Sequence, residues 1–347
     1  MTDEAARGDA TVAPDAGSAG PGLGASVPRL GVAACYFATV LGGLALADEA
    51  AALGLVLFDD PGQVGNVGVF AAMVLGFTVV LVAAVRYDRG LDLVRLLLVG
   101  SFGILVADAV VLGTGLGRLV TDDPALVGLP ASPLPVAVAV LTAAALWRHP
   151  EWYVLNVAAV VGGAAGVAML GLSFGPLPIV VLLVVWAAYD AYAVYGSGHM
   201  KEVAAGAGSM KAPLVFVVPE SRDFSYRETD LGGLGVDDED GGDGGDAGGD
   251  GFPATILGLG DALIPGMLAV SAAHFLDAPV VVPALGANLP ALGAVAGGVV
   301  GLAALTYILE RFEGVHAGLP PLNASVLAGY VLGAVAAGIP VTTALGL

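Results

Sequence analysis

Among the aspartates that stand inside apolar segments of this chain, Asp190 and Asp261 are the two best suited to chemistry. Asp190 lies in the run Trp186–Tyr192, and Asp261 follows the glycine-rich run Gly258–Gly260. Placing an ionisable side chain within a bilayer costs about 2.5–3.5 kcal/mol even on the mildest scale, so each one needs a structural or functional explanation. Two neighbouring carboxyl groups hold one proton across physiological pH. The charged member of such a pair can activate a water molecule, while the protonated member donates to the group under attack.

The same two acids also fit a different chemistry. An intramembrane aspartate is often a proton or ion site in a transporter, or a partner in a structural hydrogen bond. Spacing and depth alone do not separate peptide-bond hydrolysis from transport. The four histidines have no metal-ligand spacing, and there is no Gly-x-Ser-x-Gly elbow, phosphate-binding loop or basic nucleic-acid face. The sequence therefore predicts no metal, no cofactor and no nucleic-acid partner.

The elements that must position these acids are membrane helices. Of the 347 residues, 57% are hydrophobic and 12% are charged, with a mean hydropathy of +0.88. A soluble domain carries about 25% charged residues. Each span needs about 20 apolar residues, and the candidates are 30–47, 66–85, 93–116, 133–147, 152–171, 175–195, 254–275, 289–309 and 320–340. We therefore expect an all-α polytopic protein with nine transmembrane helices in the cell membrane.

The basic residues predict how this bundle is oriented. With the N-terminus in the cytoplasm, eleven of the twelve lysines and arginines lie on the cytoplasmic side, and only Arg118 lies outside. The C-terminus is then outside. Asp190 lies roughly 9 Å and Asp261 roughly 12 Å below the cytoplasmic ends of consecutive antiparallel helices, at about 1.5 Å per residue. The two acids are thus expected at nearly the same level.

The remaining segments predict the domain organisation. Residues 1–28 read as a disordered acidic tail, 29–195 as transmembrane helices 1 to 6, and 254–347 as helices 7 to 9. Between them, 196–253 form a long cytoplasmic loop that contains a disordered Gly/Asp run at 237–251. The net charge of −19 comes mostly from the tail and the loops. Such solvated acid suits a very salty cytoplasm and favours a halophilic source.

Motifs around both acids resemble those of one known family. Tyr189-Asp190, followed by further tyrosines, resembles the sixth-helix motif of archaeal presenilin homologues. Gly258-Leu259-Gly260-Asp261 resembles the Gly-x-Gly-Asp motif of the presenilin and signal peptide peptidase family. Pro320-Pro321-Leu322 resembles that family's Pro-Ala-Leu motif, with proline in place of the alanine. The resemblance covers nine spans in order, from about residue 30 to 345.

The resemblance implies an intramembrane aspartyl endopeptidase that acts on transmembrane proteins or peptides through Asp190 and Asp261. It implies site-shaping roles for Tyr189, Gly258, Leu259, Gly260, Pro320, Pro321 and Leu322. The two glycines leave no side chain ahead of Asp261, so a second backbone can come close. Two other interpretations stay open, namely an ion- or proton-coupled transporter that uses the same acids and a catalytically silent relative that binds membrane proteins.

The long loop contains one run that favours a β-strand, Pro213–Pro219. A helical substrate hides its peptide bonds in its own hydrogen bonds, so it must unwind before cleavage. An extended strand can recognise such an opened segment by main-chain pairing. We therefore expect this run to pair with the substrate, and replacing Val215 and Val217 with proline to reduce cleavage.

Overall fold

The computed structural model describes residues 23–86, 90–115, 133–194, 213–221, 223–229, 254–311 and 317–347. Within these ranges, every one of the nine predicted segments contains a long helix. The helices are α1 (Leu23–Ala52), α2 (Gly65–Arg86), α3 (Gly90–Thr114), α5 (Pro133–Arg148), α6 (Trp152–Ser173), α7 (Pro176–Tyr192), α9 (Leu259–Phe275), α10 (Leu289–Arg311) and α11 (Leu319–Ala336). A short helix, α12 (Val341–Ala344), follows.

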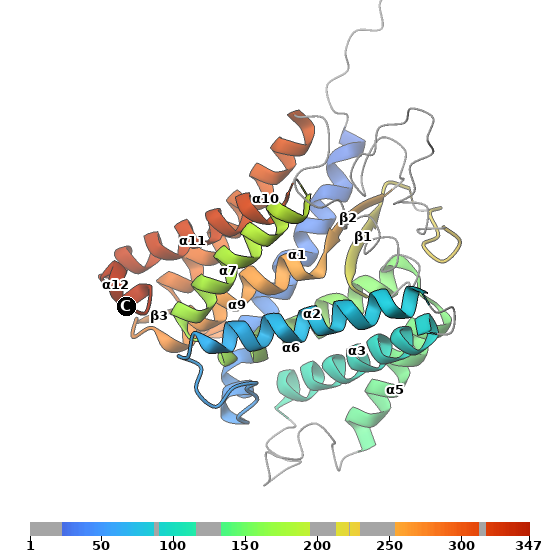
Figure 1. The fold of residues 1–347 in the computed structure, drawn as a ribbon, viewed down its shortest axis with the longest axis horizontal. Coiled ribbons are helices and arrows are strands. Elements are labelled where there is room, and N and C mark those ends of the chain that lie inside the picture. Colours follow the sequence, from blue (N-terminus) through green and yellow to red (C-terminus); the bar gives the residue numbers. More distant parts are fainter. Residues whose placement is uncertain are drawn as a thin grey trace, which may run out of the picture.

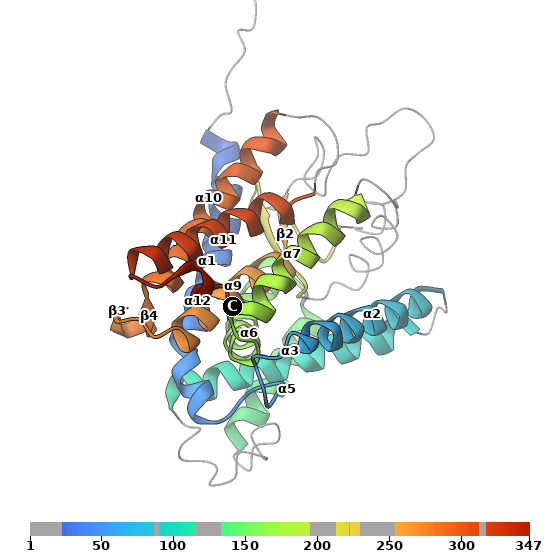
Figure 2. The ribbon, with the colours of Figure 1, turned by 60° about the vertical axis from the view of Figure 1, so that its left-hand side comes forward.

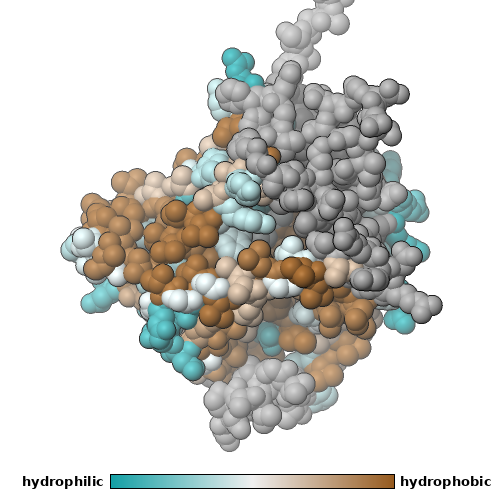
Figure 3. Space-filling view, in the orientation of Figure 1, coloured by the Kyte–Doolittle hydropathy of each residue, from teal (hydrophilic) through white to brown (hydrophobic). Residues whose placement is uncertain are grey.

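The helices are apolar, and several have the length of membrane spans. Five of them are long and apolar enough to cross a bilayer, namely α1, α3, α6, α10 and α11, while α2, α5, α7 and α9 are shorter apolar helices. Large apolar side chains face outward along the bundle, with Val79 exposed to 67% and Leu332 to 69%. Figure 3 shows apolar surface spread over the helical body. These features indicate a mostly helical, multi-pass membrane protein, as predicted.

Several expectations concern residues outside the described ranges. They include most of the N-terminal tail, the Gly/Asp run at 237–251, most of the loop at 196–253 around it, and Arg118. At the start of the chain, α1 already begins at Leu23, inside the segment assigned to the tail. The helix includes Pro28, which reads as a helix boundary when the sequence is taken alone.

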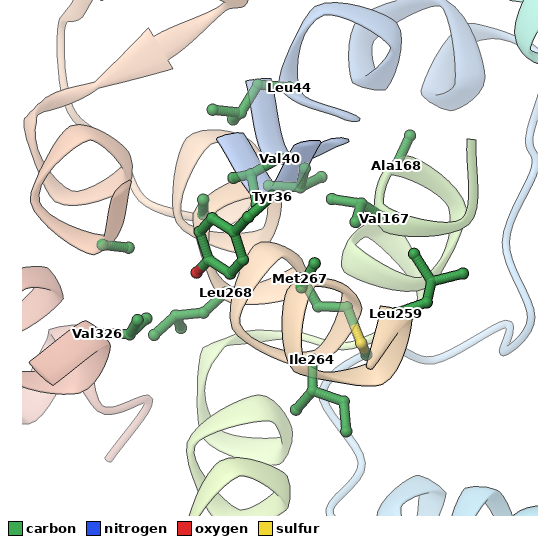
Figure 4. Packing of buried hydrophobic residues seen from close by; sticks show 14 of the residues in the cluster. Tyr36, Val40, Leu44, Val167, Ala168, Leu259, Ile264, Met267, Leu268 and Val326 are labelled. Carbon is green, nitrogen blue, oxygen red and sulfur yellow. The ribbon is translucent and has the colours of Figure 1, made fainter. Parts of the chain in front are cut away.

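Helix α9 lies at the centre of the bundle. It contacts α1, α6, α7, α10 and α11, and in the view of Figure 1 it lies between α7 and α6. Figure 4 shows side chains such as Tyr36 of α1 and Val167 of α6 converging on Met267 and Leu268 of α9. Close packing needs small residues here, because a Cβ on Gly171 of α6 would lie only 2.6 Å from Val270 Cβ.

The other helices flank this centre on two sides. Helices α10 and α11 pack tightly against each other, and a Cβ on Gly297 would lie 2.7 Å from Val326 Cα. On the other side, α3 contacts α2, α5 and α6. Figure 2 shows α2, α3 and α5 gathered away from the α10–α11 pair. Helix α6 thus joins this outer group to α9.

A small antiparallel sheet precedes α9. Strand β1 (Val215–Pro219) confirms the predicted strand in the long loop, and it pairs with β2 (Ala254–Gly258) so that Val217 lies opposite Ile256. The Leu259 N–H extends the pairing by donating to the Leu214 carbonyl at 2.8 Å. The expectation that 254–258 opens the seventh membrane helix is wrong. These residues are apolar and partly β-branched, and pairing with β1 holds them extended until α9 begins at Leu259.

A second short hairpin joins α9 to α10. It consists of β3 (Val280–Val282), the 3₁₀ turn η4 (Pro283–Leu285) and β4 (Ala287–Asn288). Gly286 closes the turn with a φ of 57°, a left-handed conformation that glycine adopts without strain. Asn288 is buried and bonds to the Ala272 carbonyl and the Ala291 N–H, which fixes the far end of α9.

Candidate active site

Asp190 is held by the first turn of another helix. It lies near the end of α7, and its Oδ2 accepts a hydrogen bond of 3.0 Å from the backbone N–H of Leu319, which begins α11. The first N–H groups of a helix have no partner inside it, and the positive end of the helix dipole favours a carboxylate there. Pro320 and Pro321 follow in the same turn and have no N–H. Leu319 is therefore the residue of this turn whose N–H is presented to the acid.

Asp261 occupies the corresponding place at the start of α9. It is the third residue of the helix, and its carboxylate interacts with the backbone N–H of Gly258, the N-cap residue. This is the geometry in which a side chain in the first turn reaches back to the capping residue. A Cβ on Gly258 would lie 3.2 Å from the Asp261 Oδ2. The glycine therefore leaves room for the carboxylate of Asp261 itself.

The structure places the two acids within electrostatic range of each other. They come from α7 and α9, which contact each other. Both side chains are partly exposed, so water can reach them. Tyr36 of α1 also lies within electrostatic range of Asp261, and it is almost completely buried. Two carboxyl groups within range of each other can divide the roles of acid and base between them.

The other motif residues differ in how they are packed. Gly260 is exposed, and no described atom lies within 4 Å of a Cβ placed on it, so it packs against no second backbone here. Leu259 is buried against Gly163 of α6, and Leu322 is buried against Gly301 of α10. Both leucines anchor their helices. Leu319, three residues before Leu322 in the same motif region, supplies the N–H that Asp190 accepts, and a site-shaping role for Leu322 stays a prediction.

Tyr189 lies directly before Asp190 on α7, and its ring contacts Trp186. Half of its side chain is exposed, and the centroids of the two rings lie 6.4 Å apart. Within the described part of the chain its hydroxyl makes no hydrogen bond. Tyr192, also exposed, continues this aromatic surface on α7. Such a surface is typical of aromatic residues at a membrane interface.

One buried polar residue next to the third motif is not apparent from the motifs. Asn323 lies one turn after Leu319, is 1% exposed, and donates from Nδ2 to the Leu183 carbonyl of α7 at 2.9 Å. Its Oδ1 is buried without a hydrogen-bond partner among the described residues. The amide therefore fastens α11 to α7 at a second point, since Leu319 and Asp190 join the same two helices. A polar amide in an apolar helix is the sequence signal that points to it.

We expect Asn323→Leu to lower kcat for a transmembrane peptide about tenfold, because Leu319 is no longer fixed opposite Asp190 and small misplacements are costly in catalysis. Stability should change by less than about 1 kcal/mol, since the variant loses one hydrogen bond but also removes an unsatisfied buried oxygen. Initial rates and thermal unfolding measure the two effects. Asn288→Leu, which removes a buried amide elsewhere, is the control. An unchanged kcat in Asn323→Leu would contradict this role.

Comparisons with known proteins agree with these observations. The family model described as "Signal-peptide peptidase, presenilin aspartyl protease" matches residues 33–339. A solved structure of a presenilin family intramembrane aspartate protease in space group C222 is 26% identical, with a TM-score of 0.57, over 90% of this chain and 100% of that one. A structure so described in space group P2 is 27% identical, with a TM-score of 0.58, over 90% and 99%.

Among curated proteins, none matches the chain significantly. The family match nevertheless spans most of the sequence, and the matched residues include both acids and all three motifs. The resemblance seen in those motifs is thereby confirmed. This chain belongs to the signal peptide peptidase and presenilin family of aspartyl proteases, and it is an intramembrane aspartate protease.

Proposed function

We propose that Asp190 and Asp261 are the catalytic pair and that they hydrolyse peptide bonds of transmembrane substrates with an activated water molecule. The observation that carries the proposal is that these two carboxyl groups lie within electrostatic range of each other at adjoining helix ends, each next to a backbone N–H. The charged carboxylate removes a proton from water as the oxygen attacks the scissile carbonyl. The protonated partner donates to the carbonyl oxygen, and the roles reverse when the amine leaves. The shared proton belongs to the pair.

We further propose nine membrane spans with the N-terminus in the cytoplasm and the C-terminus outside. Alternating spans put the end of α7 and the starts of α9 and α11 on the cytoplasmic side. The hydrogen bond between Asp190 and Leu319 requires two of these ends to meet. The distribution of lysines and arginines supports the same orientation. The acids then lie near the cytoplasmic surface, where water is available.

The small sheet offers one edge for an unwound substrate. Val217 directs its N–H and C=O away from β2, to the side chain of Asn156. Alternate residues of an antiparallel strand face opposite edges, so Ile256, which lies opposite Val217, directs its own N–H and C=O to the outer edge of β2. No described strand pairs with that edge. We therefore place the substrate on β2 and not, as first expected, on β1.

This edge leads directly to Asp261. Gly258 lies two residues after Ile256, so its N–H faces the same edge, and there it interacts with the Asp261 carboxylate. Gly260 leaves open space beside the same stretch. A substrate that adds to β2 as an extended strand would thus bring its backbone to the acid.

The protease and transporter hypotheses can be distinguished with one preparation of the protein. The purified protein should cleave a detergent-solubilised transmembrane peptide, with the new termini identified by mass spectrometry. The same protein in liposomes should show no ion or proton flux above protein-free vesicles. Family membership favours this outcome over the transporter and over a silent binding relative. Flux that depends on Asp190 and Asp261, without peptide cleavage, would contradict the proposed function.

A further inference from the structure

Asn156 makes an unusual contact with the sheet. It lies near the start of α6 and is 7% exposed. Its Nδ2 donates to the Val217 carbonyl at 2.7 Å, and its Oδ1 accepts from the Val217 N–H at 2.8 Å. One side chain therefore supplies both hydrogen bonds that a strand residue otherwise exchanges with a residue on a neighbouring strand.

This contact closes the outer edge of β1. The bond from the Leu259 N–H to the Leu214 carbonyl shows that Leu214 faces β2. Counting along the strand, 216 and 218 face β2 as well, while Val217 faces α6. Val217 is completely buried. A second strand cannot add to β1 at Val217 without displacing the amide, so the edge left available among the described residues is that of β2.

The same contact is linked to the position of Asp261. Strand β1 contacts α6, and β1 pairs with β2 along the whole of both strands. Strand β2 continues without a break into α9, whose third residue is Asp261. Helix α6 also packs directly against α9. The anchor point at Asn156 therefore helps to set where the outer edge of β2 lies relative to the acid.

A second side chain from the same end of α6 holds the following part of the loop. Glu151 accepts hydrogen bonds from the Ser225 hydroxyl at 2.8 Å and from the Tyr226 N–H at 3.1 Å. These bonds do not involve β1 or β2. Of these two attachments of the described loop residues to α6, the one at Asn156 acts on the sheet.

We propose that Asn156 is a positioning residue that caps β1, so that the sheet is assembled before substrate binds and accepts the substrate strand only on β2. The cap fixes the register between the bound strand and Asp261, and so determines which peptide bond is cut. The proposal rests on the proposed function of Asp190 and Asp261 and on docking at β2. It adds the residue that selects the edge and the register.

The test uses Asn156→Leu, which keeps the volume of the side chain and removes both hydrogen bonds. KM for a transmembrane peptide should rise about tenfold with a smaller change in kcat, as expected when a binding edge is weakened. Mass spectrometry of the products should show cleavage at additional positions, because the strand register is no longer fixed. The Val217 amide, protected in the native enzyme, should exchange rapidly with deuterium in the variant.

Two matched variants separate positioning from general stability. Glu151→Gln and Asn288→Leu each disturb a polar anchor away from the sheet, and both should keep the native KM and cleavage positions even where thermal stability falls. If Asn156→Leu does not fold, the same measurements on Asn156→Asp test the proposal. Aspartate keeps the shape of the side chain and puts a carboxyl oxygen in place of the amide that donates to the Val217 carbonyl.

The proposal is overturned if the Asn156 variant loses protection at Val217 but retains the native KM and the native cleavage positions. It is also overturned if Asn288→Leu changes the cleavage positions in the same way, because the effect would then be one of stability. Failure of the proposed function gives a different result. Cleavage would then persist in the Asp190→Asn or Asp261→Asn enzyme, whatever the Asn156 variants do.

Discussion

Replacing Ile256 with proline is expected to reduce kcat/KM for a transmembrane peptide about 10- to 100-fold while β1 and β2 remain paired. Ile256 directs its N–H to the outer edge of β2, so proline removes a donor that the substrate needs and none that β1 uses. A substrate carbonyl left without its partner costs about 1–3 kcal/mol, which corresponds to that range. Proline is tolerated on strand edges of this kind, and the extended Thr255 before it suits the restriction that proline imposes.

The measurement is a set of initial rates over a range of substrate concentrations, combined with thermal unfolding. Ile256→Val keeps the N–H and the β-branched shape, and it should behave like the native enzyme. Leu257→Pro is the opposite control. Leu257 lies opposite Phe216 of β1, so losing its backbone N–H to proline should unfold the sheet. A folded Ile256→Pro enzyme with native kcat/KM would show that the substrate does not dock along this edge.

The helices could be predicted because a membrane span requires a long run of apolar residues, which is visible in the sequence. Each long apolar run gave a helix, and most boundaries fell within a few residues of those expected. The start of α9 shows the limit. Ala254–Gly258 is an apolar run like its continuation, and hydropathy alone does not tell a buried strand from a helix. The partner that decides the matter, β1, lies about forty residues earlier in the chain.

The site was accessible to sequence reasoning only in part. Asp190 and Asp261 are conspicuous because a carboxyl group in an apolar segment is costly. Their partners are backbone N–H groups of Leu319 and Gly258, and nothing in the sequence distinguishes these from any other N–H until the helix starts are known. Leu322 illustrates the converse. Its place in a motif suggested the site, whereas packing against Gly301 determines where it lies.

The two amides show why long-range contacts were missed. Asn156 and Asn323 are visible in the sequence as polar residues within apolar helices. Their partners, the backbone of Val217 and the carbonyl of Leu183, lie 61 and 140 residues away along the chain. A backbone group carries no signal of its own in the sequence. Only the packing of α6 against β1 and of α11 against α7 brings the members of each pair together.

The largest effect is expected from Asp190→Asn and Asp261→Asn. Asparagine keeps the shape of the side chain and can still accept from a backbone N–H, so both variants should fold. Neither can exchange the proton that general acid–base catalysis requires, and cleavage should fall by at least about a thousandfold. The double variant should be no slower than either single variant, because groups that act as one unit are not additive.

The most direct test of the account is therefore the initial rate at which the native protein, the two Asp→Asn variants and the double variant cleave one transmembrane peptide under identical conditions. We predict products from the native protein alone, with all three variants folded and equally inactive. Substantial cleavage by a folded protein that lacks either Asp190 or Asp261 would contradict the claim that these two acids form the catalytic pair.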